Sequence, residues 1–323
     1  MELTRRDFLR VGGSVFGGAA VLGLAGCASP EARQQGEGKG PVELRREDLE
    51  YVIQFQHPEK MLAGLPTQPE ITDAMIAPFF GVSANVYEEI RAGFAVRARE
   101  AALELLENFD FRERVDRLPF EARTTVVGLG DSITDDLQSW FEILRNLVEE
   151  RRPQDEIRFV NAGFSGDTTS QIISRFLGDV VQQGPAWIIS MMGTNDVRRH
   201  GEDPTKILVS HDETEANLNM IRNFADEQTR ANRIWMTPPP VIEDRIADSP
   251  SLAPQQLMWR NEDLKEVADI VRGINDPVVD LQDVMRDPVD PELLLPDGLH
   301  PSLEGQRTIA AALVERLAEG RGR

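Results

Sequence analysis

The sequence predicts an α/β fold, in which helices cover both faces of a parallel β-sheet, preceded by a mainly helical region. From about residue 123, short apolar runs rich in β-branched residues alternate strictly with longer amphipathic segments. That alternation is typical of βαβ units. Residues 42–122 lack such runs and have helical patterns instead. The motifs with the most chemically useful side chains directly follow the strand runs, where α/β sheets place their sites.

The bulk composition limits the possible functions. The chain has 323 residues, of which 41% are hydrophobic, so it can bury a sizeable core as one large domain or as a domain with an accessory region. Its formal net charge is -20, and no stripe of Lys or Arg is present. Because nucleic acid binding needs clustered basic side chains, nucleic acid is excluded as a partner.

The first residues have the layout of an export signal. Basic residues precede an apolar stretch over 11–25, which is shorter than the roughly 20 residues of a spanning helix. The segment Thr4–Leu9, with its two adjacent arginines, resembles a twin-arginine signal. We therefore expect residues 1–27 to be a signal peptide rather than a transmembrane helix.

The only cysteine, Cys27, ends this segment in the context Leu-Ala-Gly-Cys, which resembles a lipobox. We expect lipidation of Cys27, with the protein exported by a twin-arginine route and anchored on the outer side of the cytoplasmic membrane. The lipid anchor would then be its sole membrane contact. The alternative is that Cys27 is simply a small buried residue of the apolar segment and is removed when the signal peptide is cleaved. Residues 28–41, rich in Glu, Gln and Gly, are predicted to be a flexible tether.

Within residues 42–122, the strongest helix is predicted to start near Asn85, with Glu88 placed as in a capping box. Its apolar residues recur at helical spacing: Val86, Ile90, Phe94, Ala98 and Leu105. This stripe is expected to be buried against the main domain. A lid over the site and a module that docks a partner remain open alternatives.

The main domain is divided by its periodicity into alternating strands and helices. The predicted strands are residues 124–129, 157–160, 187–191, 233–236 and 277–281. The predicted helices are residues 136–150, 168–183, 212–230, 254–272 and 302–318.

Ser132 lies in the segment Gly128–Thr134, directly between the first predicted strand and the first helix. A serine there projects from the strand end, near a helix N-terminus that favours developing negative charge. The segment is not a Gly-x-Ser-x-Gly elbow, because position 134 is Thr, and no Gly-Lys-Ser/Thr follows as in a Walker A loop. The alternative role for Ser132 is a helix N-cap.

His300 lies in the loop Leu295–Ser302, before the last predicted helix. Histidine is the side chain best suited to take a hydroxyl proton near neutral pH. Asp297, three residues earlier, could hold the imidazole tautomer and stabilise the imidazolium. An incidental surface histidine is the alternative.

Two middle segments offer donors for an oxyanion. Gly166 follows the second predicted strand, and Asn195 follows the third. The Gly166 N–H, the Asn195 amide and the Ser132 N–H are suited to stabilise the tetrahedral oxyanion of serine hydrolysis.

These four blocks, in this order, resemble those of the SGNH hydrolases, the GDSL-type esterase and lipase superfamily. The first block reads Gly-Asp-Ser-Ile, a common variation on that name. The resemblance spans roughly residues 124–318. It implies that residues 123–323 form an SGNH hydrolase domain, a flavodoxin-like three-layer α/β/α sandwich around a five-stranded parallel sheet.

The resemblance also implies roles for single residues. Ser132 would be the nucleophile, His300 its base and Asp297 the support of that base. Gly166 and Asn195, with Ser132, would form the oxyanion hole.

Other residues are assigned more modest roles. Asp131 and Asp196 are expected to hydrogen-bond the loop backbone rather than react. Five further residues are candidates to line the site: Trp140, Arg198, Arg199, His200 and His211. No His-Glu-x-x-His motif or paired cysteine is present, so a zinc enzyme is not expected. The serine mechanism expected here uses neither a metal nor an organic cofactor.

The function expected is hydrolysis of carboxylic esters through an acyl-Ser132 intermediate. The substrate would be a small-molecule, lipid or carbohydrate ester, and a carbohydrate deacetylase suits an enzyme outside the cytoplasm. Two alternatives stay open: a lysophospholipase or lipase, and a surface lipoprotein that binds without catalysis. The sequence leaves the oligomeric state open.

Overall fold

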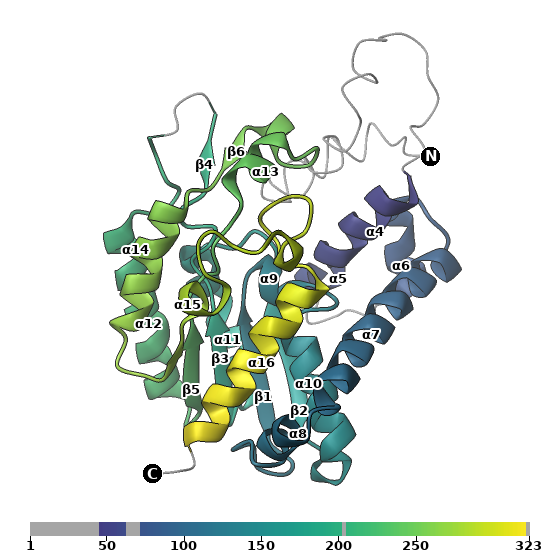
Figure 1. Cartoon of the computed structure of the whole chain (residues 1–323), viewed down its shortest axis with the longest axis vertical. Helices are drawn as coiled ribbons and strands as arrows, with labels where there is room; N and C mark the ends of the chain where they lie inside the picture. The colour runs from purple at the N-terminus through teal and green to yellow at the C-terminus, as the bar shows by residue number, and fades with distance from the viewer. Residues whose placement is uncertain (1–44, 63–71, 202–204, 321–323) are drawn as a thin grey trace.

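The computed structural model describes residues 45–62, 72–201 and 205–320 (Figure 1). The predicted signal peptide, Cys27 and the predicted tether therefore lie outside the described residues. Within the described ranges, no helix combines the length and the apolar character needed to cross a bilayer.

The predicted five-stranded parallel sheet is confirmed, with strand order β2-β1-β3-β5-β7. This is the doubly wound order of flavodoxin-like folds, in which the chain starts near the middle and winds both ways. The strands are β1 (Thr125–Gly130), β2 (Arg158–Gly163), β3 (Trp187–Met191), β5 (Asn232–Met236) and β7 (Val278–Val279).

Two layers of helices cover the sheet, because alternate side chains of each strand point to opposite faces. Val126 of β1 belongs to one core cluster, with α10 (Trp140–Arg151) and α16 (Leu303–Glu319). Val127 belongs to a second cluster on the other face. The helices of that second layer are α11 (Thr169–Asp179), α12 (His211–Gln228) and α14 (Asn261–Arg272).

Shorter elements complete the chain. The remaining helices are α4 (Arg46–Phe55), α5 (Pro58–Leu62), α6 (Asp73–Ile76), α7 (Ala84–Leu106), α8 (Phe109–Asp116), α9 (Ser132–Asp135), α13 (Glu243–Asp248) and α15 (Leu281–Met285). Single 3₁₀ turns are η1 (Ala77–Phe80), η2 (Pro153–Asp155), η3 (Val181–Gln183), η4 (Ala253–Gln255) and η5 (Pro291–Leu293).

A second, antiparallel pair of strands was not predicted. It joins β4 (Arg199–His200) to β6 (Leu257–Met258). The helix predicted over 254–272 therefore starts only at Asn261, because the preceding residues pair with β4. Two-residue strands have no periodicity from which they could be predicted.

Other predicted boundaries also shift. The strand β2 continues through Gly163, because residues 161–163 pair with the end of β1. The long helix α7 begins at Ala84, and Ser83 is its N-cap, with its side chain accepting from Val86 N–H. The helix therefore starts near Asn85 as predicted, but Asn85 lies inside it, so the capping pair predicted for Asn85 and Glu88 was wrong.

The helical N-terminal region is packed on the main domain. Along α7, Tyr87, Ile90, Phe94 and Ala98 are buried, whereas Leu105 is half-buried and Leu106 takes the inward position. Helix α7 lies against α10 and α16 (Figure 1). Helix α4 packs on α7 through a third apolar cluster, which places α4 beside the carboxyl ends of the strands.

Candidate active site

Three predicted side chains form one hydrogen-bonded row. Ser132 Oγ lies 2.9 Å from His300 Nε2, and His300 Nδ1 lies 2.6 Å from Asp297 Oδ2. Ser132 is the first residue of α9 and not its cap, because Asp131 is the N-cap and accepts from Ile133 N–H at 3.1 Å. All three members are at most 9% exposed, so water competes little with these bonds.

The loop that carries His300 is built around Asp297. Its Oδ1 accepts the N–H groups of Leu299 and His300 at 2.9 and 3.0 Å, which leaves Oδ2 for the imidazole. Gly298 has a φ of +75°, and a Cβ there would lie 2.5 Å from Arg245 Cβ. The local conformation of the Asp-Gly-Leu-His loop therefore brings the carboxylate and the imidazole into contact.

The electrostatics of the pair suit a general base. Burial disfavours a charged His300, but the charge and hydrogen bond of Asp297, with Asp136 and Asp131 nearby, raise its pKa above the ordinary value. Burial likewise opposes ionisation of Asp297, yet His300 and the two N–H groups hold the pKa of this carboxyl below its usual range. A carboxylate that stays ionised can fix the imidazole tautomer and stabilise the imidazolium.

The three predicted oxyanion donors line the same cavity as the hydrogen-bonded row. Gly166 has a φ of +87°, and a Cβ at this position would meet no atom within 4 Å. Backbone conformation, rather than crowding, therefore favours glycine there. The Asn195 amide donates to Asp167 O at 3.2 Å, which orients it beside the same loop.

Replacing Asn195 with alanine is expected to lower kcat for an ester substrate by about 10²–10³-fold, as for other oxyanion donors. KM should change less, because the oxyanion develops only in the transition state. Steady-state kinetics of Asn195→Ala and wild type would measure this. A variant with the full rate would show that the amide is not an oxyanion donor.

Residues of α4 complete the site, and sequence reasoning missed them. Tyr51 donates its hydroxyl to Asp297 Oδ2 at 2.9 Å, and the Phe55 ring lies 4.3 Å from the His300 ring between centroids. The only signal in the sequence is that these aromatic residues are four apart and share one helix face. Nothing in that spacing identifies the loop they contact.

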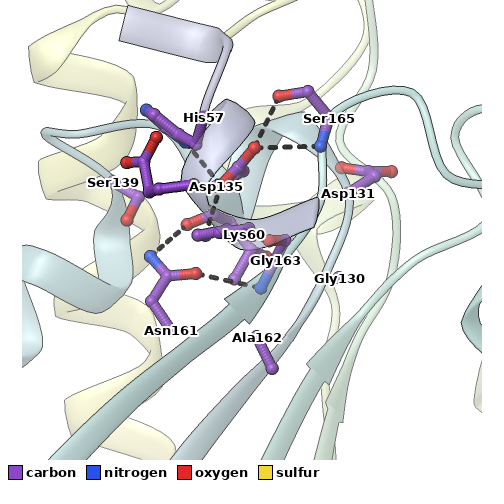
Figure 2. A network of polar contacts seen from close by, with 12 residues as sticks. His57, Lys60, Gly130, Asp131, Asp135, Ser139, Asn161, Ala162, Gly163 and Ser165 are labelled. Carbon is purple, nitrogen blue, oxygen red and sulfur yellow. Dashed lines mark hydrogen bonds and ion pairs between the residues drawn. The ribbon is translucent and has the colours of Figure 1, made fainter. Parts of the chain in front are cut away.

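A buried carboxylate, Asp135, joins the N-terminal region to Ser165, the residue before Gly166 (Figure 2). Its Oδ1 contacts His57 Nδ1 at 2.7 Å and also pairs with Lys60 Nζ. Its Oδ2 accepts both the N–H and the hydroxyl of Ser165 at 2.9 Å. Lys60 also donates to Gly163 O at 2.9 Å. The segment after α4 therefore supports the backbone that presents the Gly166 N–H.

We expect Asp135→Asn to destabilise the protein by about 3–5 kcal/mol, because the variant removes a buried carboxylate from its contacts with His57 and the Lys60 ammonium. Burial raises the pKa of Asp135, but His57 and Lys60 outweigh burial and hold it far below the ordinary value. A lowered folded-state pKa stabilises the protein above the unfolded pKa, so the deficit should begin to shrink below about pH 4. Urea unfolding across that pH range would measure it.

Asp269→Asn is the matched control, since Asp269 pairs with Arg272 with its side chain 70% exposed. It should change the stability by less than about 0.5 kcal/mol. Equal effects of the two substitutions would show that the Asp135 cluster does not stabilise the fold.

The cavity at Ser132 has a volume of about 160 Å³. Its walls come from α4, from the loops after β1, β2 and β3, and from the segment around η4 and β6. The lining residues are Tyr51, Val52, Phe55, Gln56, Ser132, Ser165, Gly166, Asn195, Arg198, Ser251, Leu252, Gln255, Leu257, Trp259, Leu299 and His300.

Of the five further candidates for the site, only Arg198 lines this cavity. Trp140 is fully buried in the core at the start of α10, because its indole packs against Phe141. Arg199 is buried in a two-pronged pair with Asp263. His200 is exposed in β4, and His211 is the first residue of α12. The site predictions for these four residues were wrong.

Asp131 and Asp196 bond the backbone as predicted. Asp196 accepts the Thr169 N–H at 2.8 Å and also two threonine hydroxyls. In the part of the chain that the structure describes, no three His, Cys, Asp or Glu side chains are grouped as metal ligands.

Comparisons with known proteins agree with this geometry. The GDSL-like Lipase/Acylhydrolase family model matches residues 129–308. The acetylxylan esterase of Geobacillus stearothermophilus is 29% identical over 178 residues, which is 53% of this chain and 77% of that protein.

Two solved structures of variants of an acetyl-xylooligosaccharide esterase from that organism also match. One has a TM-score of 0.52 and 24% identity, covering 62% of this chain and 96% of that chain. The other has a TM-score of 0.50 and 23% identity, covering 61% and 95%. At these identities the structural matches show the shared fold alone.

Proposed function

Because the chain belongs to the GDSL-like lipase/acylhydrolase family, we propose that it hydrolyses esters with Ser132 as nucleophile, His300 as general base and Asp297 as the support of that base. The observation that carries this assignment is the unbroken row of hydrogen bonds from Ser132 Oγ through the imidazole to Asp297. The protein is an ester-hydrolysing serine hydrolase, so a nucleophile with its base already in hydrogen-bond reach is what the chemistry requires.

The reaction would proceed in two halves. His300 Nε2 takes the proton of Ser132 as Oγ attacks the ester carbonyl, and the resulting oxyanion is stabilised by the N–H groups of Ser132 and Gly166 and by the Asn195 amide. The tetrahedral intermediate collapses to acyl-Ser132, and the alcohol leaves with the proton from His300. Water, deprotonated by the same imidazole, then releases the acid and restores Ser132.

For the substrate, we propose an acetyl ester of a carbohydrate. Similarity to an acetylxylan esterase supports this choice. The cavity volume of about 160 Å³ supports it as well, since it is below the roughly 300–1,000 Å³ of pockets that enclose drug-sized ligands. A short acyl group fits such a space better than a long lipid chain.

The test is hydrolysis by the full-length protein of p-nitrophenyl esters from acetyl to palmitoyl, together with acetate release from acetylated xylo-oligosaccharides. We expect kcat/KM to be highest for acetyl and acetate to be released from the sugar. A maximum at long acyl chains would favour the lipase alternative. No turnover of any ester by a folded protein would favour a non-catalytic binding protein.

We also propose that residues 1–27 direct twin-arginine export and that Cys27 anchors the protein outside the cytoplasmic membrane. The twin arginines and the Leu-Ala-Gly-Cys segment support this proposal. Incorporation of labelled palmitate into wild type but not into Cys27→Ala would be the expected result. Equal labelling of both would contradict it.

A further inference from the structure

Arg198 gives the cavity a local positive charge on a strongly acidic protein. The chain has a formal net charge of -20. Among the described residues, no Asp, Glu or Lys lines the cavity, and Arg198 is its only arginine. Its backbone N–H donates to Asn195 O at 3.2 Å, so the chain fixes Arg198 directly beside the proposed oxyanion donor.

The guanidinium of Arg198 lacks a partner within the described ranges of the chain. Its Nε is buried without a hydrogen-bond acceptor, and no ion pair joins it to a carboxylate. Burial lowers the pKa of Arg198, and no acidic side chain of residues 45–62, 72–201 and 205–320 opposes that effect. Its neighbour Arg199 shows the usual arrangement instead, because both ends of its guanidinium contact Asp263 at 2.7–2.9 Å.

A partly buried cation without a counter-ion is unfavourable, because its desolvation is not offset by an ion pair. An anionic ligand would remove this deficit. The planar guanidinium offers two parallel N–H donors, which match the two oxygens of a carboxylate. The cavity therefore suits a substrate that carries a carboxylate close to the ester.

We propose that Arg198 selects acetylated acidic sugars by binding the carboxylate of a uronate residue. This inference rests on the proposed function, since an acetyl group has no charge and the carboxylate must then belong to the alcohol part of the ester. The neutral polar groups of Gln56, Ser251 and Gln255 line the remaining polar wall, where sugar hydroxyls can bind.

The kinetic test uses two substrates that differ only at C6: methyl glucuronoside, with a carboxylate there, and methyl glucoside, with a hydroxymethyl group, each acetylated at the same ring hydroxyl. The full-length wild type is expected to prefer the glucuronoside. In Arg198→Gln, the ratio of kcat/KM for the acidic over the neutral ester should fall about 10- to 100-fold, the effect of losing a charged hydrogen-bond pair. Arg198→Lys keeps the positive charge but lacks the two parallel N–H donors, so it should lose part of the preference for the acidic ester.

Arg230→Gln is the matched control, because Arg230 is exposed, does not line the cavity and its loss changes the net charge equally. For this variant, the ratio of kcat/KM for the acidic over the neutral ester should stay within about twofold of wild type. Salt screens a single surface charge, so it has little effect on the attraction between the protein and the acidic substrate. If the two glutamine variants lower the ratio equally, the preference is a general charge effect and the Arg198 inference is wrong.

A binding measurement separates this inference from the proposed function. Titration calorimetry would measure the affinity of unacetylated methyl glucuronoside for Ser132→Ala and for the Ser132→Ala, Arg198→Gln double variant. This measurement needs no turnover. We expect at least about tenfold weaker binding to the double variant. Equal binding to both overturns the role of Arg198, even if sugar acetates are hydrolysed. Weaker binding without any hydrolysis of sugar acetates would support the anion site and contradict the proposed reaction.

Discussion

Ser132→Ala should lower kcat for ester hydrolysis by about 10⁶-fold, the scale found when the nucleophile of a serine hydrolase is removed. The row of hydrogen bonds ends at the Ser132 hydroxyl, and His300 Nε2 lies 2.9 Å from it. Without Oγ no acyl-enzyme can form. The remaining oxyanion donors can then assist only a slow attack by water. Steady-state assays with p-nitrophenyl acetate would measure the loss, with the rate expressed per mole of folded protein.

The fold should tolerate this substitution. Ser132 is 9% exposed, and its hydroxyl is not needed to cap α9, since Asp131 provides the N-cap. The far-UV circular dichroism and the urea midpoint should therefore match wild type. A second check is non-additivity: Ser132→Ala combined with His300→Ala should cost no more than either alone. Additive losses, or turnover above about 1% of wild type in Ser132→Ala, would contradict a shared role in one step.

Asp297→Asn should lower kcat by about 10⁴-fold, the effect of replacing the carboxylate of a catalytic triad. The variant also loses the charge that, with its hydrogen bond, raises the pKa of His300 against burial. The base acts in its neutral form, so in wild type kcat/KM should rise with pH through an inflection above about 6.5. In Asp297→Asn, less opposes the lowering of the His300 pKa by burial, so this acid limb should move to lower pH. A pH profile of kcat/KM from about pH 4 to 9 would record both effects.

Tyr51→Phe is the matched control for Asp297→Asn. It removes the hydroxyl that donates to Asp297 Oδ2 at 2.9 Å and keeps both the ring and the carboxylate. We expect a loss in kcat of about 10- to 100-fold, the effect of losing one hydrogen bond to a charged group, which is well below the loss for Asp297→Asn. An acid limb at the same pH in wild type and in Asp297→Asn would show that this carboxylate does not set the proton affinity of His300.

The sequence by itself determined the sheet and the chemistry at its edge. Strand runs and amphipathic segments are local patterns, and the order of alternation demands parallel strands. Parallel strands place their carboxyl ends at one edge, so the residues that follow β1, β2 and β3 had to converge there. Ser132, Gly166 and Asn195 were predicted from that logic, and Asp297 and His300 from a short loop that carries its own geometry.

Tertiary structure alone decided which side chains surround these groups. Two adjacent arginines were equal candidates in the sequence, yet Arg199 pairs with Asp263, 64 positions away, while Arg198 lines the cavity. Trp140 was a plausible wall residue, but the packing of α10 buries it in the core.

The contribution of α4 was equally hidden, because Tyr51 and Asp297 are 246 positions apart. The same holds for His57 and Asp135, 78 positions apart, whose contact links the N-terminal region to the loop of Gly166. A periodic pattern reports which face of a helix is buried, since burial is shared by every turn of that helix. It does not report the partner, because a single contact between distant residues depends on how whole elements pack and leaves no repeat in the chain.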